Sequence, residues 1–211
     1  MIIAKYGITL QRLSEEDIEL VRYWRNQPEI RQRMAYRGHI TSEMQQQWFD
    51  SVNTKYHYYF VIIYEGRKIG LINTKNVNMQ DKYGEGGIFI WEQELWNTYV
   101  PSLASLVLLE FTFKILDFSN KSFIQILHSN SAAIKYNKAI GYVLIPGQEN
   151  VENQWYILIK EDFLKRFDKL ERGSCIVSGH YDPIEVIGEP SDKNLDIINK
   201  LLQSLKKEGG N

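Results

Sequence analysis

The chain has 211 residues, of which 44% are hydrophobic, so it is large enough for one domain with a sizeable core. Its 25 basic and 26 acidic residues give a net charge of −1, which excludes the cationic field that sequence-independent binding to nucleic acid requires. The single cysteine, Cys175, excludes an internal disulfide, and the four scattered histidines do not have the spacing of paired metal ligands, so we expect no structural metal and a reducing, cytoplasmic location.

The N-terminal part predicts one strand and several short helices. Residues Ile2–Leu10 alternate apolar and polar side chains as a strand does, and they lack the charged and then apolar regions of a signal peptide. Ser14 and the acidic residues after it are typical of a helix start, and helical spacing of apolar residues continues to about Pro28. Further helices are expected over residues 29–34 and from residue 41 onward.

The middle of the chain favours antiparallel strands followed by a buried helix. Tyr58–Tyr64 and Ile69–Val77 flank a turn with glycine and are predicted to form a hairpin, and another strand is expected over Glu85–Trp91. Pro101 fits the first turn of a helix whose apolar residues cover more than one face. Because Glu110 interrupts this apolar run well short of about 20 residues, we expect no membrane-spanning segment and no membrane partner.

The next elements complete a mixed sheet. Phe123–Leu127 is a short apolar strand, and the helix before it implies a crossover that makes it parallel to the preceding strand. Ala132–Ala139 is expected to be a helix that ends at Gly141, and Tyr142–Ile145 with Gln154–Ile159 is expected to be a hairpin. The sequence therefore predicts an α/β (α+β) fold with a mostly antiparallel sheet and helices on both faces.

The composition changes near residue 171 toward glycine, serine, proline and charged residues. Cys175–Ser178 is a short β-like run, and residues Ser191–Lys206 place apolar side chains on one face of a predicted amphipathic helix. We therefore expect a domain over residues 1–170 and a C-terminal extension over residues 171–211. The apolar face of this helix would pack either on its own domain or across a homodimer.

Two short motifs accompany this order of elements. Trp-Arg-Asn at residues 24–26 ends the first helix, and Trp-Phe at residues 48–49 lies in a later helix. Over about residues 8–163, the motifs and the order resemble the GNAT superfamily of acyl-CoA-dependent N-acyltransferases. More narrowly, they resemble the branch of aminosugar N-acetyltransferases and ribosomal-protein alanine acetyltransferases.

The resemblance implies an N-acetyltransferase that moves acetyl from acetyl-CoA, its donor substrate, to a primary amine without a metal. We expect a small-molecule acceptor, the amine of a nucleotide-linked aminosugar, because the near-neutral charge gives no steering toward basic ribosomal proteins. The alternatives are a ribosomal-protein-type N-terminal acetyltransferase and a non-catalytic binding module of the same fold.

The chemistry of such a transfer indicates which catalytic groups to expect. An ammonium must lose a proton, an oxyanion must be stabilised and a thiolate must leave. Glu85, on a predicted strand ahead of two glycines, is the candidate base, with His39 and His57 as rivals. Many family members protonate the thiolate with a tyrosine at the position of Asn137, whereas this chain has Tyr136 one residue earlier. Either Tyr136 packs in the core and Asn137 or water serves the thiolate, or the helix is wound differently there.

The resemblance also places CoA. Its pantetheine arm is expected along the Glu85–Trp91 strand, and its diphosphate at the N-terminus of the following helix. The family's glycine-rich loop corresponds to residues 96–102, where two expected glycines are replaced by Asn97 and Tyr99, so the loop must take another path or hold the diphosphate less well. The residues expected to bind the cofactor are Phe89, Ile90, Trp91, Asn97, Thr98, Tyr99, Ser102, Leu103, Asn130, Ala133 and Lys138.

The acceptor side is expected to be aromatic and basic. Aromatic rings stack on sugars or bases, and arginine pairs with a diphosphate through two hydrogen bonds. Many aminosugar enzymes of this branch carry a histidine where Gln45 stands, which leaves the role of Gln45 open. Ordinary core packing is the alternative reading of Trp48. The residues expected on this side are Trp24, Arg25, Asn26, Tyr36, His39 and Trp48.

Overall fold

The computed structural model describes residues 1–54 and 56–188. Its strands form one sheet in the order β7-β8-β6-β5-β4-β3-β2-β1-β9, which is antiparallel except between β5 and β6. The predicted fold class is confirmed. The strands are β1 (Ile2–Lys5), β2 (Ile8–Arg12), β3 (Tyr58–Tyr64), β4 (Arg67–Asn78), β5 (Tyr83–Ile90), β6 (Lys121–Leu127), β7 (Val143–Leu144), β8 (Asn153–Ile159) and β9 (Glu185–Ile187).

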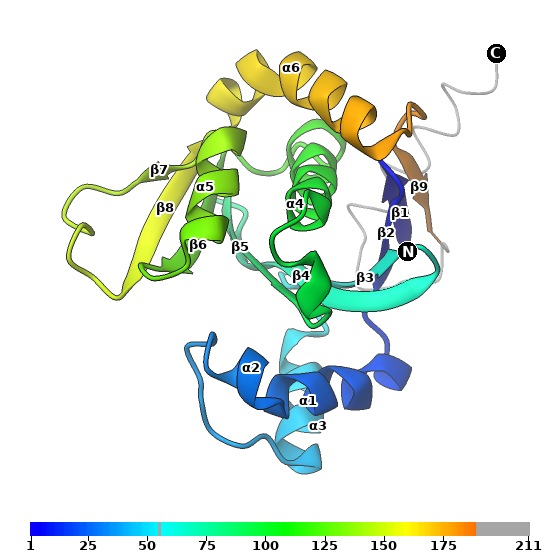
Figure 1. Ribbon diagram of the computed structural model, residues 1–211, viewed down its shortest axis with the longest axis vertical. Coiled ribbons are helices and arrows are strands. Elements are labelled where there is room, and N and C mark those ends of the chain that lie inside the picture. Colours follow the sequence, from blue (N-terminus) through cyan, green and yellow to red (C-terminus); the bar gives the residue numbers. More distant parts are fainter. Residues whose placement is uncertain (55, 189–211) are drawn as a thin grey trace.

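Helices cover both faces of this sheet (Figure 1). Alternate residues of a strand point to opposite faces, so Leu71 and Phe89 pack toward one helical layer while Ile72 and Ile90 pack toward the other. The sheet therefore separates two apolar cores. The first layer is α1 (Ile18–Asn26), α2 (Pro28–Arg31) and α3 (Ser42–Val52), and the second is α4 (Val100–Glu110), which continues as a π-helical turn over Phe111–Ile115, with α5 (Ser131–Ile140) and α6 (Lys160–Ser178).

The N-terminal strand predicted over Ile2–Leu10 is in fact a hairpin of β1 and β2. Tyr6 and Gly7 form its two-residue turn, with φ angles of +55° and +74°. Two positive φ angles in succession match the twist that a tight hairpin needs. Lys5 pairs with Ile8 across the turn, and the alternation of side chains continues on both strands. The turn is therefore hidden within an apparently unbroken strand pattern.

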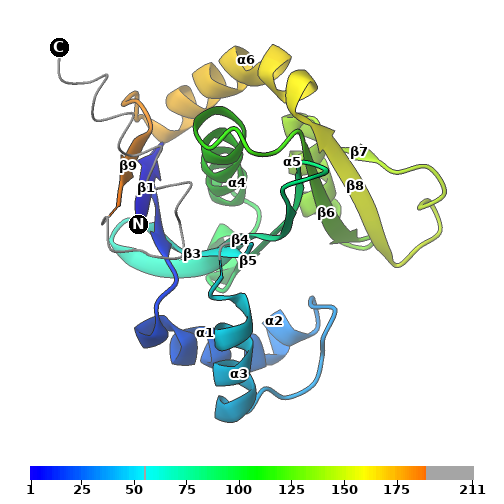
Figure 2. The ribbon, with the colours of Figure 1, turned by 180° about the vertical axis from the view of Figure 1, so that it is seen from behind.

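The C-terminal part differs from the predicted β-like run at Cys175–Ser178, because α6 extends through these residues and ends at Gly179 with a φ of +73°. Helical continuity from Lys160 outweighs the β-propensity of the short run. The same helix crosses the expected boundary at residue 170, and β9 then pairs with β1 at the end of the sheet opposite β7 (Figure 2). The amphipathic helix predicted over residues 191–206 lies outside the described residues.

A buried ion cluster joins β1, α4 and α6. The ammonium of Lys5 donates to both carboxylate oxygens of Glu110 at 3.0 and 2.9 Å and to Glu171 at 2.5 Å. Burial alone would lower the pKa of Lys5, but the hydrogen bonds to Glu171 and Glu110 outweigh it and raise the pKa above its ordinary value. Because such a pair is costly to break once buried, the cluster fixes α6 against the sheet.

Candidate functional site

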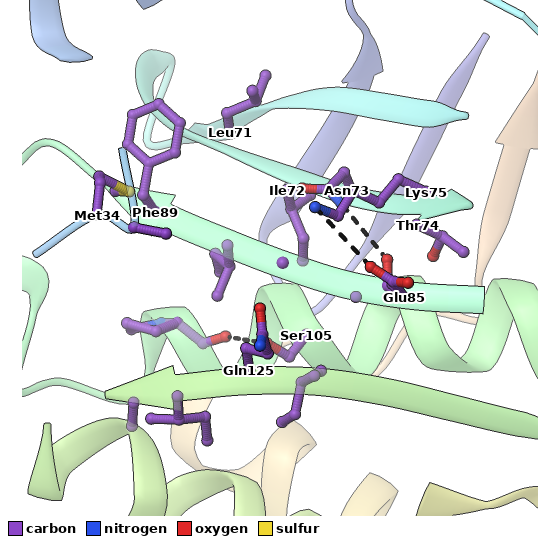
Figure 3. A pocket seen from close by; sticks show the side chains of 18 of the residues that line it. Met34, Leu71, Ile72, Asn73, Thr74, Lys75, Glu85, Phe89, Ser105 and Gln125 are labelled. Atoms are coloured by element: carbon purple, nitrogen blue, oxygen red, sulfur yellow. Dashed lines mark hydrogen bonds and ion pairs between the residues drawn. The ribbon is translucent and has the colours of Figure 1, made fainter. Parts of the chain in front are cut away.

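The two parallel strands at the centre of the sheet part from each other. Strands β5 and β6 pair only from Tyr83 with Lys121 to Gly86 with Ile124. Beyond that point, β5 continues to pair with β4 and β6 continues to pair with β8. The strands therefore leave a gap between them after Gly86, and cavity-lining side chains surround it (Figure 3).

Backbone groups of β5 point into this gap. The N–H of Trp91 donates to the carbonyl of Ile69 at 2.9 Å, and alternate residues of an antiparallel strand share this orientation. It follows that Ile88 and Ile90 direct their N–H and C=O groups away from β4, toward the gap. The carbonyl of Ile90 accepts a hydrogen bond from the indole N–H of Trp96 at 2.8 Å. The N–H groups of Ile88 and Ile90 have no strand partner in the described part of the chain.

A cavity of about 750 Å³ runs along this gap and is lined from both faces of the sheet. Gly87 gives the side chain of Asn73 room in the cavity wall, because a Cβ at residue 87 would lie 2.9 Å from Oδ1 of Asn73. Residues from α1 and α3 line one side, and residues from α4 and α5 line the other. Among the lining residues are Arg25, Gln45, Trp48, Tyr59, Glu85 and Phe89 toward the first helical layer, and Pro101, Ser105, Ala133, Tyr136 and Asn137 toward the second.

Glu85 lies on the cavity wall toward the first helical layer. Its side chain is 23% exposed, and its carboxylate lies 3.9 Å from the ammonium of Lys75 on the neighbouring strand. The amide of Asn73 donates to the backbone carbonyl of Glu85 at 3.4 Å, on the same stretch of wall (Figure 3). A carboxylate with this access to the cavity can accept a proton from a bound amine.

Tyr136 and Asn137 both line the cavity from α5. Tyr136 is half-buried, and burial raises the pKa of its hydroxyl against smaller opposing effects of the Asn137 and Ser105 side chains. Asn137 is 6% exposed, and its amide donates to the carbonyl of Ala133 at 2.9 Å. Asn130 begins the helix, since its side-chain oxygen accepts from the Ala133 N–H at 3.1 Å. Of the two residues, only Tyr136 carries a hydroxyl that can give up a proton.

The loop before α4 follows a path without positive φ at Asn97 or Tyr99. The hydroxyl of Tyr99 lies 3.4 Å from that of Tyr64, and its ring does not line the cavity. The Val100 N–H donates to the hydroxyl of Thr98 at 3.2 Å, and the next residue is a proline, which has no N–H. The first turn of α4 therefore offers an anion fewer amides than a glycine-rich loop would.

Within the Trp-Arg-Asn motif, the first and third residues support the fold. The ring of Trp24 stacks on that of Trp91 with centroids 6.0 Å apart and an interplanar angle of 2°. The side chain of Asn26 donates to the carbonyl of Ile40 and accepts from its N–H, both at 2.8 Å. These contacts hold the segment before α3 beside the cavity, which Ile40 lines.

Arg25 is the motif residue that lines the cavity. It is half-buried, its guanidinium lies 5.7 Å from the centroid of Phe89, and burial lowers its pKa. Among the described residues, none forms an ion pair or hydrogen bond with this guanidinium. Gln45, on α3, also lines the cavity, and its side-chain nitrogen is buried without a hydrogen-bond partner.

The structure brings about half of the predicted site residues to the cavity. Those that line it are Arg25, Tyr36, Trp48, Glu85, Phe89, Ile90, Asn97, Asn130, Ala133, Tyr136 and Asn137. Those that do not are Trp24, Asn26, His39, Trp91, Thr98, Tyr99, Ser102, Leu103 and Lys138.

The two histidine rivals of Glu85 lie outside the cavity. His39 is exposed, and the ring of His57 contacts Thr54 and Asn76 at 2.9 and 3.3 Å. The sequence analysis missed Asn73, Lys75 and Ser105, which line the cavity as well. Asn73 and Lys75 could have been expected, because they alternate along the strand that pairs with the Glu85 strand and so lie on the same face of the sheet as Glu85. Within residues 1–54 and 56–188, no group of three His, Cys, Asp or Glu side chains could hold a metal, and no helix is long and apolar enough to cross a membrane.

Comparison with known proteins supplies the family. Residues 8–143 match the family model described as an acetyltransferase (GNAT) domain. Comparison with curated proteins finds no match.

Solved structures with a similar fold include a domain from Methanocaldococcus jannaschii, with 22% identity, 72% of this chain and 97% of that chain covered, and a TM-score of 0.63. The spermidine N-acetyltransferase from Vibrio cholerae in complex with CoA and spermine is similar at 16% identity, with 76% and 99% covered and a TM-score of 0.64. The aminoglycoside acetyltransferase AAC(6')-Ib in complex with coenzyme A is similar at 14% identity, with 75% and 98% covered and a TM-score of 0.63.

At these identities the solved structures show the fold, whereas the family match extends over more than half of the chain. The gap between β5 and β6 and the cavity along it are consistent with the acetyltransferase activity that the family match indicates. The chain belongs to the GNAT family and is an acetyl-CoA-dependent N-acetyltransferase.

Proposed function

We propose that this acetyltransferase acts on the primary amine of a nucleotide-linked aminosugar, as enzymes of the aminosugar branch do. The observation that carries the proposal is the half-buried Arg25, which lines the cavity and whose guanidinium has no carboxylate partner among residues 1–54 and 56–188. A charge removed from water without a partner is costly, and a diphosphate offers arginine two parallel hydrogen bonds. The rings of Trp48 and Phe89 line the same region and can stack on a sugar or base.

The positive charge of the cavity wall favours an acceptor that carries negative charge elsewhere, such as a diphosphate. Its described ionised residues are four bases, Arg25, Arg33, Lys75 and Lys121, and one acid, Glu85. Such a wall attracts a nucleotide diphosphate and repels a polyamine or the N-terminus of a basic protein. This charge favours a nucleotide sugar over a substrate such as the spermine in the Vibrio cholerae complex, and over a ribosomal protein.

We assign the chemical steps to residues on opposite faces of the sheet. Glu85 accepts a proton from the acceptor ammonium, directly or through one water, and the freed amine attacks the thioester carbonyl carbon. As the C–N bond forms and the C–S bond breaks, the N–H of Ile88 stabilises the negative charge on the carbonyl oxygen. Tyr136 gives its proton to the departing thiolate, which leaves as the free thiol, and the phenolate takes up the second proton of the attacking nitrogen, directly or through one water, so that the product is a neutral amide and the only net proton released is the one on Glu85. Asn137 is less suited to this role because its amide already donates to Ala133.

The residues of the gap fit the pantetheine arm of acetyl-CoA better than those of the loop fit its diphosphate. Ile88 and Ile90 offer backbone N–H groups that no strand uses. At the N-terminus of α4, Thr98 and Pro101 leave fewer amides for the phosphates. We therefore expect acetyl-CoA to bind mainly through the gap, with a modest contribution from the helix terminus.

A comparison of acceptors, each assayed separately, tests the proposal. The purified full chain is given acetyl-CoA with a nucleotide-linked aminosugar, spermidine or a basic N-terminal peptide, and thiol release is followed. We expect the highest kcat/KM for the nucleotide sugar. The variant Arg25→Met should have a KM for the nucleotide sugar that is at least about tenfold higher, because the charge-assisted hydrogen bonds between Arg25 and the diphosphate are lost. Its KM for acetyl-CoA should not change. The exposed Arg172→Met is the matched control. Robust peptide or polyamine acetylation with no turnover of any nucleotide sugar would overturn the proposal.

We also propose a homodimer as the working state of the chain. A spermidine N-acetyltransferase from Vibrio cholerae, similar in fold, is dodecameric, so the fold is compatible with assembly. Light scattering at increasing protein concentration measures the mass, and a monomer at every concentration would exclude the dimer.

A further inference from the structure

One polar side chain in the cavity wall has no role in the chemistry above. Gln45 is 3% exposed, and its Nε2 is buried without a hydrogen-bond partner. Its backbone N–H donates to Thr41 at 3.0 Å, so the helix around it is regular and only the side chain is unsatisfied. A buried donor without a partner costs folding free energy, and native proteins retain few of them.

Packing does not explain a glutamine at this position. Phe49 and Val52 share the face of α3 on which Gln45 lies, and both belong to the apolar core. An apolar side chain of similar size would fill the same space without an unpaired donor. The neighbouring Gln46 shows the usual arrangement on a helix surface, since its amide donates to Asp50 at 3.1 Å.

The surroundings of Gln45 indicate what its amide can recognise. It lines the same cavity as Trp48 and Arg25, on the side of the sheet that Glu85 faces. The amide nitrogen of Gln45 and the guanidinium of Arg25, both on this wall, each favour an oxygen atom and disfavour an ammonium group. Sites built to hydrogen-bond a substrate oxygen reject analogues that lack it more strongly than apolar pockets do.

We propose that Gln45 is a specificity-determining residue whose side-chain amide turns toward the cavity when the acceptor binds and donates a hydrogen bond to a hydroxyl or carbonyl oxygen of the acceptor. The inference rests on the proposed function and deepens it, because it makes an oxygen near the reacting amine a requirement for good acceptors. An aminosugar carries such oxygens, whereas a polyamine does not.

The variant Gln45→Leu tests this role, because leucine is close in size and has no donor. Each variant is assayed with an oxygen-bearing amine and its deoxy analogue. We expect the ratio of their kcat/KM values to fall at least about tenfold in Gln45→Leu, with the KM for acetyl-CoA unchanged. The melting temperature of the free protein should stay constant or rise by about 2–4 °C, because an unsatisfied donor is removed. Gln47→Leu, exposed on the same helix, should change none of these quantities.

Each outcome decides the matter. A lower melting temperature with an equal loss for every acceptor would show a packing role and overturn the proposal, and so would an unchanged ratio. If nucleotide sugars are turned over and the ratio is unchanged, only the role of Gln45 fails. If no nucleotide sugar is turned over but another oxygen-bearing amine shows the expected fall, the proposed function fails and the role of Gln45 stands.

Discussion

Replacing Glu85 by glutamine separates the chemistry of the site from its stability. The substitution keeps the size of the side chain and removes the group that accepts the proton. The Glu85–Lys75 pair has an N···O distance of 3.9 Å and side chains that are 23% and 43% exposed, so its loss costs at most about 1 kcal/mol. That corresponds to a fall in melting temperature of at most about 4 °C. Loss of a general base lowers the rate by a factor of about 10² to 10⁴.

The assay measures initial rates of thiol release at saturating acetyl-CoA, together with thermal unfolding of the same samples. We expect kcat/KM for the acceptor to fall at least about 100-fold in Glu85→Gln while the fold is kept. The control Glu161→Gln removes an exposed carboxylate that pairs with Lys165 at 2.9 Å, and it should retain full activity. If Glu85→Gln retains kcat/KM within about tenfold of the parent, Glu85 is not the base and the proton leaves by another route.

Three further predictions concern the thiolate, the diphosphate and the buried ion cluster. Tyr136→Phe should lower kcat at least about tenfold, because burial keeps the phenol protonated as a donor. With a thioester donor whose thiol is more acidic, the thiolate needs less protonation, so the fall in kcat caused by Tyr136→Phe should be smaller. An equal fall in kcat with both thioesters would contradict the role of Tyr136. Pro101→Ala adds an N–H to the first turn of α4 and should lower the KM for acetyl-CoA about two- to tenfold, whereas an unchanged KM in the same assay would place the diphosphate elsewhere. Lys5→Met leaves the buried carboxylate of Glu110 without its main partner and should lower the free energy of unfolding, measured in urea, by about 3–5 kcal/mol. Adding Glu110→Leu to this variant should restore most of the lost free energy of unfolding. If the double variant is no more stable than Lys5→Met, the account of the ion cluster is wrong. Since the pKa of Lys5 is raised on folding, its contribution is complete below the unfolded pKa of about 10.4 and falls as the pH rises through the folded pKa, so Lys5→Met should be less destabilising at about pH 11 than at about pH 8.

Most of the fold could be predicted because its signals are local. The run Tyr58–Tyr64 is a strand with the predicted bounds, and Gly141 ends its helix with a φ of +124° as expected. The N-terminal hairpin was missed because apolar and polar residues alternate in the sequence straight through its turn, whereas the buried positions change from Ile3 and Lys5 on β1 to Ile8 and Leu10 on β2. The whole of α6 was missed: no helix was predicted over residues 160–178, and Ile176 and Val177 near its end favour strands locally.

The site was less predictable, because cavity access depends on packing between elements. Strand alternation placed Glu85 and Phe89 on one face, and both line the cavity. Sequence spacing could not show that the indole of Trp24 would be used in stacking while its neighbour Arg25 faces the cavity. Nor could it show that Gln45 is buried with an unpaired nitrogen, since this depends on every atom around it.

The parted strands also bear on the order of events in turnover. The two helical layers lie on opposite faces of the sheet, and residues from both line the cavity at the gap. The single thiol of the chain, Cys175, is buried in α6 rather than on the cavity wall, so it is not placed to carry an acyl group from one substrate to the other. We therefore expect direct transfer within a ternary complex, and double-reciprocal plots of rate against the two substrates should intersect rather than run parallel.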